Sequence, residues 1–302
     1  MIRPLCYALI SVVAWSWATA GSPLAQDRAG DVIAQARHAI SRNVAAAGVS
    51  SLSIGAKVRR VLQASGGMEV TSDVQLEFLL PERFRRTESM TFGAVSREIT
   101  MGLNGNDLLW DDGGAAALLG RDPTAPGLLQ EQTKLELRRE AFRLLTVWLL
   151  APPLTPPAAI TYAGVAEAPD GKADVVDVQG GPGGLGLRLF LDTASHRLLM
   201  ATYVSQVSDP DQAKAIKDAL MEKARKDPQN ARKLVLAASE DIEKLPKKAI
   251  TVEMHFSDYR AIGGVTLPGT MVVDTEGQGQ EEWTIVSCTL NAPIKPERFE
   301  RR

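Results

Sequence analysis

Most of the chain alternates between apolar and polar residues with a period of two, which is typical of β-strands that bury one side and expose the other. In the clearest example, Val74, Leu76 and Phe78 are separated by two polar residues. The alternation predicts further strands over residues 52–56, 85–91, 97–103, 107–111, 160–165, 172–178, 185–192, 197–205, 251–256, 266–274 and 282–290. Turn-forming residues separate many of these segments, as at Asn104-Gly105-Asn106, so we expect antiparallel pairing of neighbours.

Three segments break the alternation and predict helices. Residues 27–44 repeat apolar positions at every fourth residue, and residues 127–150 contain a longer apolar stripe with basic residues on the other sides. A run of prolines after residue 151 ends the second helix, because proline lacks a backbone donor. Residues 209–248 are rich in alanine and in charged residues, and they predict two helices broken near Asp227-Pro228. The stripe of the second helix consists of Leu137, Ala141, Leu144, Leu145 and Trp148.

These elements predict one α+β domain over residues 27–300, with the charged helices of residues 209–248 inserted between strands. The sequence shows no internal repeat and no low-complexity linker that would separate two domains. The insertion is open to two interpretations. It is either a solvated helical hairpin without a partner, or a moving lid or docking arm.

The beginning of the chain has the features of a cleavable export signal over residues 1–20. Arg3 precedes an apolar stretch that is too short to span a bilayer, and Ala18-Thr19-Ala20 is a small-residue cleavage site. The alternatives are a cut after Ala25 and an anchor that is never removed. Cys6 lies near the start of the apolar stretch rather than after it, so it is unsuited to lipid attachment. We therefore expect a periplasmic protein with no transmembrane segment in the mature chain.

The charge balance gives no sign of a nucleic-acid partner. The chain has a net charge of −2, and removal of the signal with Arg3 leaves −3, with both signs interspersed. After cleavage Cys288 is the only cysteine, so no internal disulfide can form. It lies in a predicted strand, where we expect a buried, inert thiol; a reactive or intermolecular thiol is the alternative.

No constellation of residues indicates catalysis. The sequence lacks the spacing of a nucleophile elbow, a zinc-binding helix or a dinucleotide fingerprint. Residues 180–184 are rich in glycine but lack the ending of a phosphate loop, so they predict a flexible hairpin loop. Adjacent acids at 111–112 and 281–282 point to opposite faces of a strand and cannot share a substrate. We therefore expect that the protein is not an enzyme and has no catalytic residue and no cofactor. We also expect no metal site, because the three histidines are far apart in the sequence: His38, His196 and His255.

Three longer motifs carry a resemblance to a known family. Residues 78–85, Phe-Leu-Leu-Pro-Glu-Arg-Phe-Arg, run into a proline corner. Residues 103–110, Leu-Asn-Gly-Asn-Asp-Leu-Leu-Trp, pass through a glycine turn into a strand that ends in tryptophan. Residues 256–268, followed by Asn291 and Phe299, form the third stretch. This order of parts resembles the outer-membrane lipoprotein carrier family and its lipoprotein-sorting relatives.

Such a resemblance implies a half-open, unclosed β-barrel, which is a curved antiparallel sheet whose concave face is covered by helices. The apolar faces of the strands must be buried, and the apolar stripe over residues 137–148 can pack against them. In the family this concavity accepts acyl chains, and burial gains about 0.8 kcal/mol per methylene. The resemblance therefore implies a non-catalytic periplasmic binding protein or chaperone for a lipid or an acylated protein. The residues expected to line the apolar cavity are Val74, Leu76, Phe78, Trp110, Leu144, Trp148, Val252, Met254 and Phe256.

Two departures separate this chain from the carrier proper. The carrier tends to have a basic pair before the corner proline, whose arginine holds the lid helices, whereas this chain has Leu79-Leu80. Trp110 is followed by Asp111-Asp112 rather than by an aromatic residue. An alternative function on the same fold is an envelope protein-interaction or stress-sensing module. In that case another envelope protein would dock on residues 209–248.

Overall fold

The computed structural model describes residues 23–41, 48–62, 68–92, 95–111, 128–150, 158–168, 171–276 and 279–300. The predicted signal peptide and the run of prolines after residue 151 lie outside these residues. Within the described chain, twelve strands form one antiparallel sheet. Their bounds are β1 (Ser51–Leu62), β2 (Met68–Leu79), β3 (Arg83–Phe92), β4 (Val95–Asn104), β5 (Asp107–Asp111), β6 (Ala159–Ala168), β7 (Gly171–Gln179), β8 (Leu187–Asp192), β9 (Leu198–Ser208), β10 (Lys247–Ile262), β11 (Val265–Thr275) and β12 (Gly279–Leu290).

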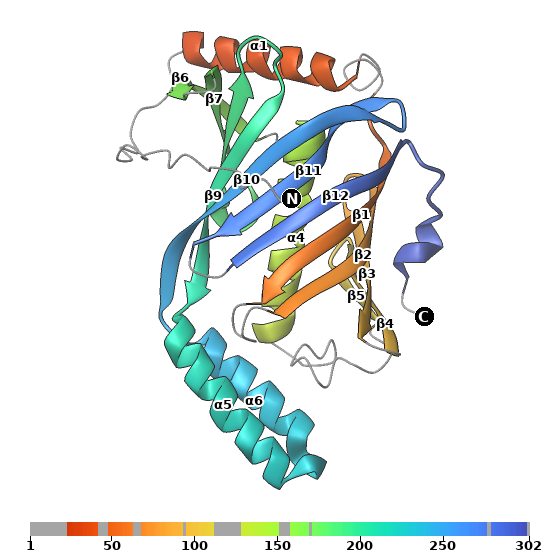
Figure 1. Ribbon diagram of the computed structural model, residues 1–302, viewed down its shortest axis with the longest axis vertical. Helices are drawn as coiled ribbons and strands as arrows, with labels where there is room; N and C mark the ends of the chain where they lie inside the picture. The colour runs from red at the N-terminus through yellow and green to blue at the C-terminus, as the bar shows by residue number, and fades with distance from the viewer. Residues whose placement is uncertain are drawn as a thin grey trace, which may run out of the picture.

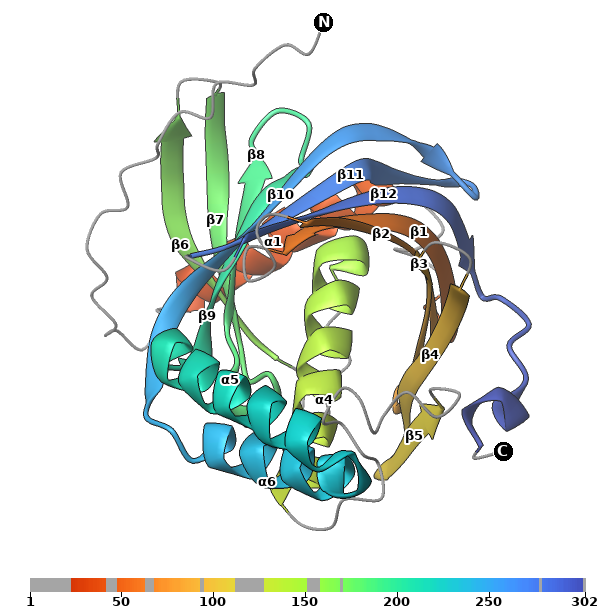
Figure 2. The same ribbon diagram turned by 60° about the horizontal axis from the view of Figure 1, so that its bottom comes forward.

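The sheet is a half-open barrel. Its neighbour order is β5-β4-β3-β2-β1-β12-β11-β10-β9-β8-β7-β6, so β5 and β6 stand at the two edges and do not pair with each other. Strand twist accumulates along so many strands and bends the sheet. Figure 2 shows the sheet curved around α4 (Leu128–Leu149), as the half-open barrel expected from the sequence requires.

Alternation along the strands determines which side chains face the concave side. Leu52 and Ile54 of β1 pair with Phe78 and Leu76 of β2, so the apolar positions of neighbouring strands share one face. Tight turns connect most neighbours in the chain. At the β10–β11 turn, a Cβ on Gly263 would lie 1.7 Å from the carbonyl oxygen of Cys288, and the φ angle is +59°. Only glycine fits this close approach.

Two helices cover the barrel. In Figure 1, α4 runs through the concavity and α1 (Pro23–Ile40) lies across the top, where it packs against β6 and β11. α1 begins earlier than the predicted helix, and proline at a first helical position is favourable because its missing donor would be unpaired there anyway. Arg37 of α1 donates a hydrogen bond of 2.9 Å from Nε to the carbonyl oxygen of Leu150, directly after α4. This bond joins the two helices.

The charged insertion forms a helical hairpin at the opposite end of the molecule (Figure 1). Its helices are α5 (Pro210–Lys226) and α6 (Ala231–Glu243), and the predicted break at Asp227-Pro228 is confirmed. Asp209 caps α5 by accepting a hydrogen bond of 2.9 Å from the backbone nitrogen of Gln212. No helix in the described part of the chain is both long and apolar enough to span a membrane.

Candidate ligand-binding clefts

The apolar part of the concave face is packed against α4. All nine positions that the sequence assigned to a cavity are buried, with at most 9% of each side chain exposed. Seven belong to one hydrophobic core: Val74, Leu76, Phe78, Leu144, Trp148, Met254 and Phe256. Trp110 and Val252 are buried as well but do not belong to that core. Side chains of α4 therefore fill much of the space that the sequence assigned to a ligand.

A cleft of about 290 Å³ remains on the side of α4 that faces β2, β3 and β4. We call it the apolar cleft. Arg138 crosses one end of it by donating a hydrogen bond of 2.8 Å to the side-chain oxygen of Asn106 in the β4–β5 turn. The rings of Phe78 and Phe84 are stacked in its wall with centroids 4.9 Å apart. Its apolar lining is Phe78, Leu80, Phe84, Leu103, Ala141, Phe142 and Leu145.

Strand register brings this lining together. Phe84 of β3 pairs with Phe78 of β2 on one side and with Leu103 of β4 on the other. The three side chains therefore stand in a row on one face of the sheet. Phe142 and Leu145 of α4 complete the wall, three residues apart and thus on one side of the helix.

A second cleft of about 210 Å³ lies on the other side of α4, against β7, β8 and β9. We call it the arginine cleft, because Arg139 and Arg143 of α4 and Arg188 of β8 line it. Arg188 forms a bidentate ion pair with Asp177, with hydrogen bonds of 2.7 and 2.8 Å. The guanidinium of Arg143 lies 4.8 Å from the centre of the Tyr203 ring. Tyr203 is partly buried, and burial raises the pKa of its hydroxyl.

The glycine-rich loop over residues 180–184 forms a wall shared by the two clefts. It contributes Pro182 to the apolar cleft and Gly183 to the arginine cleft. Arg139 holds the loop against α4 by donating hydrogen bonds of 3.2 and 3.3 Å to the carbonyl oxygens of these two residues. The loop is a hairpin connection between β7 and β8, as predicted. Its role is to anchor the helix to the second half of the sheet.

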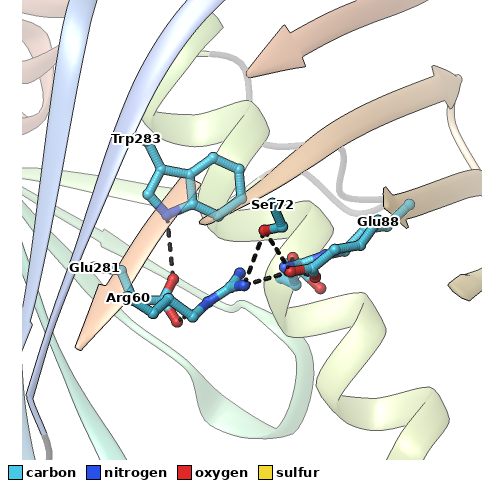
Figure 3. Close-up of polar contacts among 7 residues, drawn as sticks. Arg60, Ser72, Glu88, Glu281 and Trp283 are labelled. Carbon is cyan, nitrogen blue, oxygen red and sulfur yellow. Dashed lines mark hydrogen bonds and ion pairs between the residues drawn. The ribbon is translucent and has the colours of Figure 1, made fainter. Parts of the chain in front are cut away.

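A charged cluster lies under the middle of α4 on the same concave face, and Figure 3 shows part of it. Arg60 of β1 donates to Glu281 at 2.8 Å and also pairs with Glu88, which accepts a hydrogen bond of 2.7 Å from Ser72. Arg86 of β3 continues the chain of pairs from the sheet to the helix. The complete cluster is Arg60, Ser72, Arg86, Glu88, Glu140 and Glu281.

Arg86 connects the cluster to α4. Its guanidinium lies 2.7 Å from Glu88 and 2.5 Å from Glu140 of the helix, and it stacks over Trp283 at 5.5 Å from the ring centre. Burial would raise the pKa of Glu88, but Arg86 and Arg60 outweigh it and hold that pKa at about 2. Burial would likewise lower the pKa of Arg86, but Glu140 and Glu88 raise it. The pairs are therefore ionised together.

The structure also places the adjacent acids and the cysteine that the sequence analysis considered. Glu281 faces the charged cluster and Glu282 pairs with Arg59 on the other side of β12, so these adjacent acids do point apart. Asp112 lies outside the described residues. Cys288 is buried, and burial raises the pKa of its thiol to about 11, which fits the inert thiol expected from the sequence. Among the described residues, no group of three or more His, Cys, Asp or Glu side chains could hold a metal ion.

Most of the residues in both clefts, and the charged cluster as a whole, were not predicted from the sequence. Phe84 could have been predicted, because a three-residue corner joins its strand to that of Phe78, and two strands joined in this way pair antiparallel. The signal for the cluster was also present: Arg60, Arg86 and Glu88 fall in phase with the apolar positions of their own strands. The concave face is thus apolar over only part of its area, rather than throughout.

Comparison with known proteins identifies the fold. No family model matches the sequence, and no curated protein is significantly similar to it. A LolA superfamily protein from Nitrosomonas europaea has a structure that superimposes with a TM-score of 0.51 and 11% identity, over 90% of this chain and 97% of that one. The chain therefore shares the fold of that protein, an antiparallel sheet that curves into a half-open barrel.

Two other solved structures are similar at lower scores. A DUF1329 family protein from Desulfovibrio piger has a TM-score of 0.43 and 8% identity, over 91% of this chain and 97% of that one. A putative outer membrane lipoprotein-sorting protein domain from Vibrio parahaemolyticus has a TM-score of 0.43 and 10% identity, over 89% and 94%.

Proposed function

We propose that the protein is a non-catalytic carrier or chaperone for a lipid or a lipidated protein, and that it holds an acyl chain in the apolar cleft. The observation that carries this proposal is the cleft itself, an open space of about 290 Å³ walled by Phe78, Phe84 and Phe142. Ligand pockets begin at about 300 Å³, so this one accepts part of an acyl chain as it stands. Each methylene that it buries contributes about 0.8 kcal/mol, and binding needs few polar contacts.

The export signal predicted from the sequence supports a periplasmic location for this activity. A carrier on this fold would meet its cargo between two membranes and would need no cofactor. Contact of cargo with the more deeply buried positions, such as Leu144 and Trp148, requires α4 to shift, because these side chains now pack against the sheet. That part of the expected cavity stays a prediction.

The proposal is tested by filling the apolar cleft. Ala141 lines it from α4, so Ala141→Trp should abolish binding of a fluorescent fatty acid while the circular dichroism spectrum stays that of the wild type. The matched control is Ala215→Trp, at an exposed position of α5. Native mass spectrometry of protein purified from membranes gives an independent measurement. Equal binding by wild type and Ala141→Trp, or wild-type protein that never carries lipid, would contradict the proposal.

A second candidate is an interaction module that captures another envelope protein through the hairpin. The hairpin projects from the end of the barrel, and among its described side chains only Ala213 and Ala238 are buried. Ser208 and Lys247 are paired at its base, so an Asn-Gly turn can replace residues 209–246 without breaking the sheet. If the hairpin captures a partner, the shortened protein binds fatty acid normally and loses the partner in pull-down from periplasmic extract. Loss of fatty-acid binding would instead identify the hairpin as a lid.

A further inference from the structure

Among the described charged side chains of α4, all but Arg138 and Arg143 form ion pairs, and Arg138 instead donates a hydrogen bond to Asn106 at the apolar cleft. Each carboxylate near this side of the helix has an arginine within 4.0 Å, in the pairs Glu136–Arg139, Asp177–Arg188, Glu140–Arg86, Glu281–Arg60 and Glu88 with both Arg60 and Arg86. Arg143 lies on the same side of α4, one turn after Arg139. Among the described residues, no carboxylate forms an ion pair with it.

The surroundings of Arg143 favour an anion. Its side chain is half-buried in the arginine cleft, and one face of the guanidinium is covered by the ring of Tyr203. A guanidinium that lies over an aromatic ring keeps its N–H donors in its own plane, where a phosphate or a carboxylate at its edge can accept two of them at once. Because the Arg143 side chain is partly buried, its charge gains more from an anionic partner here than it would at a fully exposed position.

The two clefts are placed for one amphiphilic ligand. They lie on either side of α4 and border the same loop, where Pro182 lines one and Gly183 the other. Arg139 holds this loop against α4, so a ligand whose tail occupies the apolar cleft would present its head to the arginine cleft by passing over the loop. Neighbouring arginines are already neutralised by Glu136 and Asp177, so a single negative group completes the balance.

We propose that Arg143 binds the anionic group of the ligand, and that the protein selects amphiphiles with a phosphate or carboxylate head over neutral ones of the same chain length. This inference rests on the proposed acyl-chain binding and adds the chemistry of the head group. The arginine cleft is the subsite for that group, and Arg143 is its specificity-determining residue.

The experiment compares three ligands by calorimetry on the purified protein: dodecyl phosphate, dodecanol and inorganic phosphate. Wild type should bind dodecyl phosphate at least about tenfold more tightly than dodecanol, a difference of about 1.4 kcal/mol. Arg143→Met keeps the aliphatic stem over Tyr203 and should bind both amphiphiles with the affinity of dodecanol. Arg143→Lys should retain part of the preference. Arg225→Met, at an exposed position of α5, is the matched control and should behave as wild type.

The outcomes distinguish failure of the head-group preference from failure of the proposed acyl-chain binding. Equal affinity of wild type for the two amphiphiles, or an unchanged preference in Arg143→Met, overturns the inference and leaves acyl-chain binding in place. Inorganic phosphate that binds as tightly as dodecyl phosphate also overturns it, because the cleft is then a site for a free anion. If neither amphiphile binds wild type, the proposed function fails and the inference fails with it. Dodecanol binding by Arg143→Met shows that the variant is folded.

Discussion

Glu88→Gln removes one negative charge from the charged cluster while it preserves the shape of the side chain. Glu88 is 11% exposed and lies between Arg60 and Arg86, which are 16% and 13% exposed. Without it, the one carboxylate that the described residues still offer to Arg86 is Glu140, and to Arg60 it is Glu281. Removing one partner from a buried ion pair leaves the other charge buried without a partner, and this destabilises a protein by about 3–5 kcal/mol.

The pKa of Glu88 gives a second route to the same magnitude. Its two arginines lower the pKa from the usual 4.5 to about 2, and each unit corresponds to about 1.4 kcal/mol. Glu88 therefore contributes about 3 kcal/mol to folding at pH 7. Because the folded pKa lies below the unfolded one, this contribution is complete above about pH 4.5 and is lost as the pH falls through 2. About 1 kcal/mol remains at pH 3.

Urea unfolding, followed by circular dichroism at pH 7 and at pH 3, measures this difference. We expect Glu88→Gln to be less stable than wild type by about 3 kcal/mol at pH 7 and by only about 1 kcal/mol at pH 3. Glu69→Gln is the control, since Glu69 is 55% exposed and its pair with Arg59 contributes less than about 1 kcal/mol. A loss that is the same at both pH values, or a loss at pH 7 no larger than that of Glu69→Gln, would refute the reasoning.

Three further predictions concern the packing of the helices and the buried thiol. Trp148→Ala empties a site that is 1% exposed, so the free energy of unfolding should fall by about 3–5 kcal/mol, whereas Leu199→Ala, at 42% exposure, should change it by less than about 0.5 kcal/mol. Arg37→Met deletes the donor to the Leu150 carbonyl; we expect a loss of about 1–3 kcal/mol and faster amide hydrogen exchange in the last turn of α4. The Cys288 thiol, with its pKa raised to about 11, should resist a thiol reagent at pH 8 in native protein and react fully in urea. Rapid labelling of the native protein would show that Cys288 is not buried. Unchanged exchange in Arg37→Met would show that the hydrogen bond to Leu150 does not stabilise the end of α4.

The local periodicity of the sequence determined the secondary structure. Alternation predicted a strand at every place in the sheet, although β1, β2 and β10 extend about six residues beyond the predicted bounds, and the stripe from Leu137 to Trp148 predicted α4. Proline at position 228 predicted the break in the hairpin, and Gly105 predicted the β4–β5 turn. These features depend on side-chain direction and backbone freedom over a few residues, so a single stretch of sequence contains the information.

Only the tertiary structure decided what occupies the concavity. Alternation places Arg86 on the inner face of β3 beside Glu88, but its partners Glu140 and Trp283 come from α4 and β12. The apolar cleft likewise depends on how closely α4 approaches the sheet, and Arg143 is distinctive only because every neighbouring carboxylate is already paired. Ion pairs and cavities depend on residues that are far apart in the sequence and are brought together by the fold. Periodicity gives the face of each side chain, whereas its neighbours across that face follow from sheet order and helix placement.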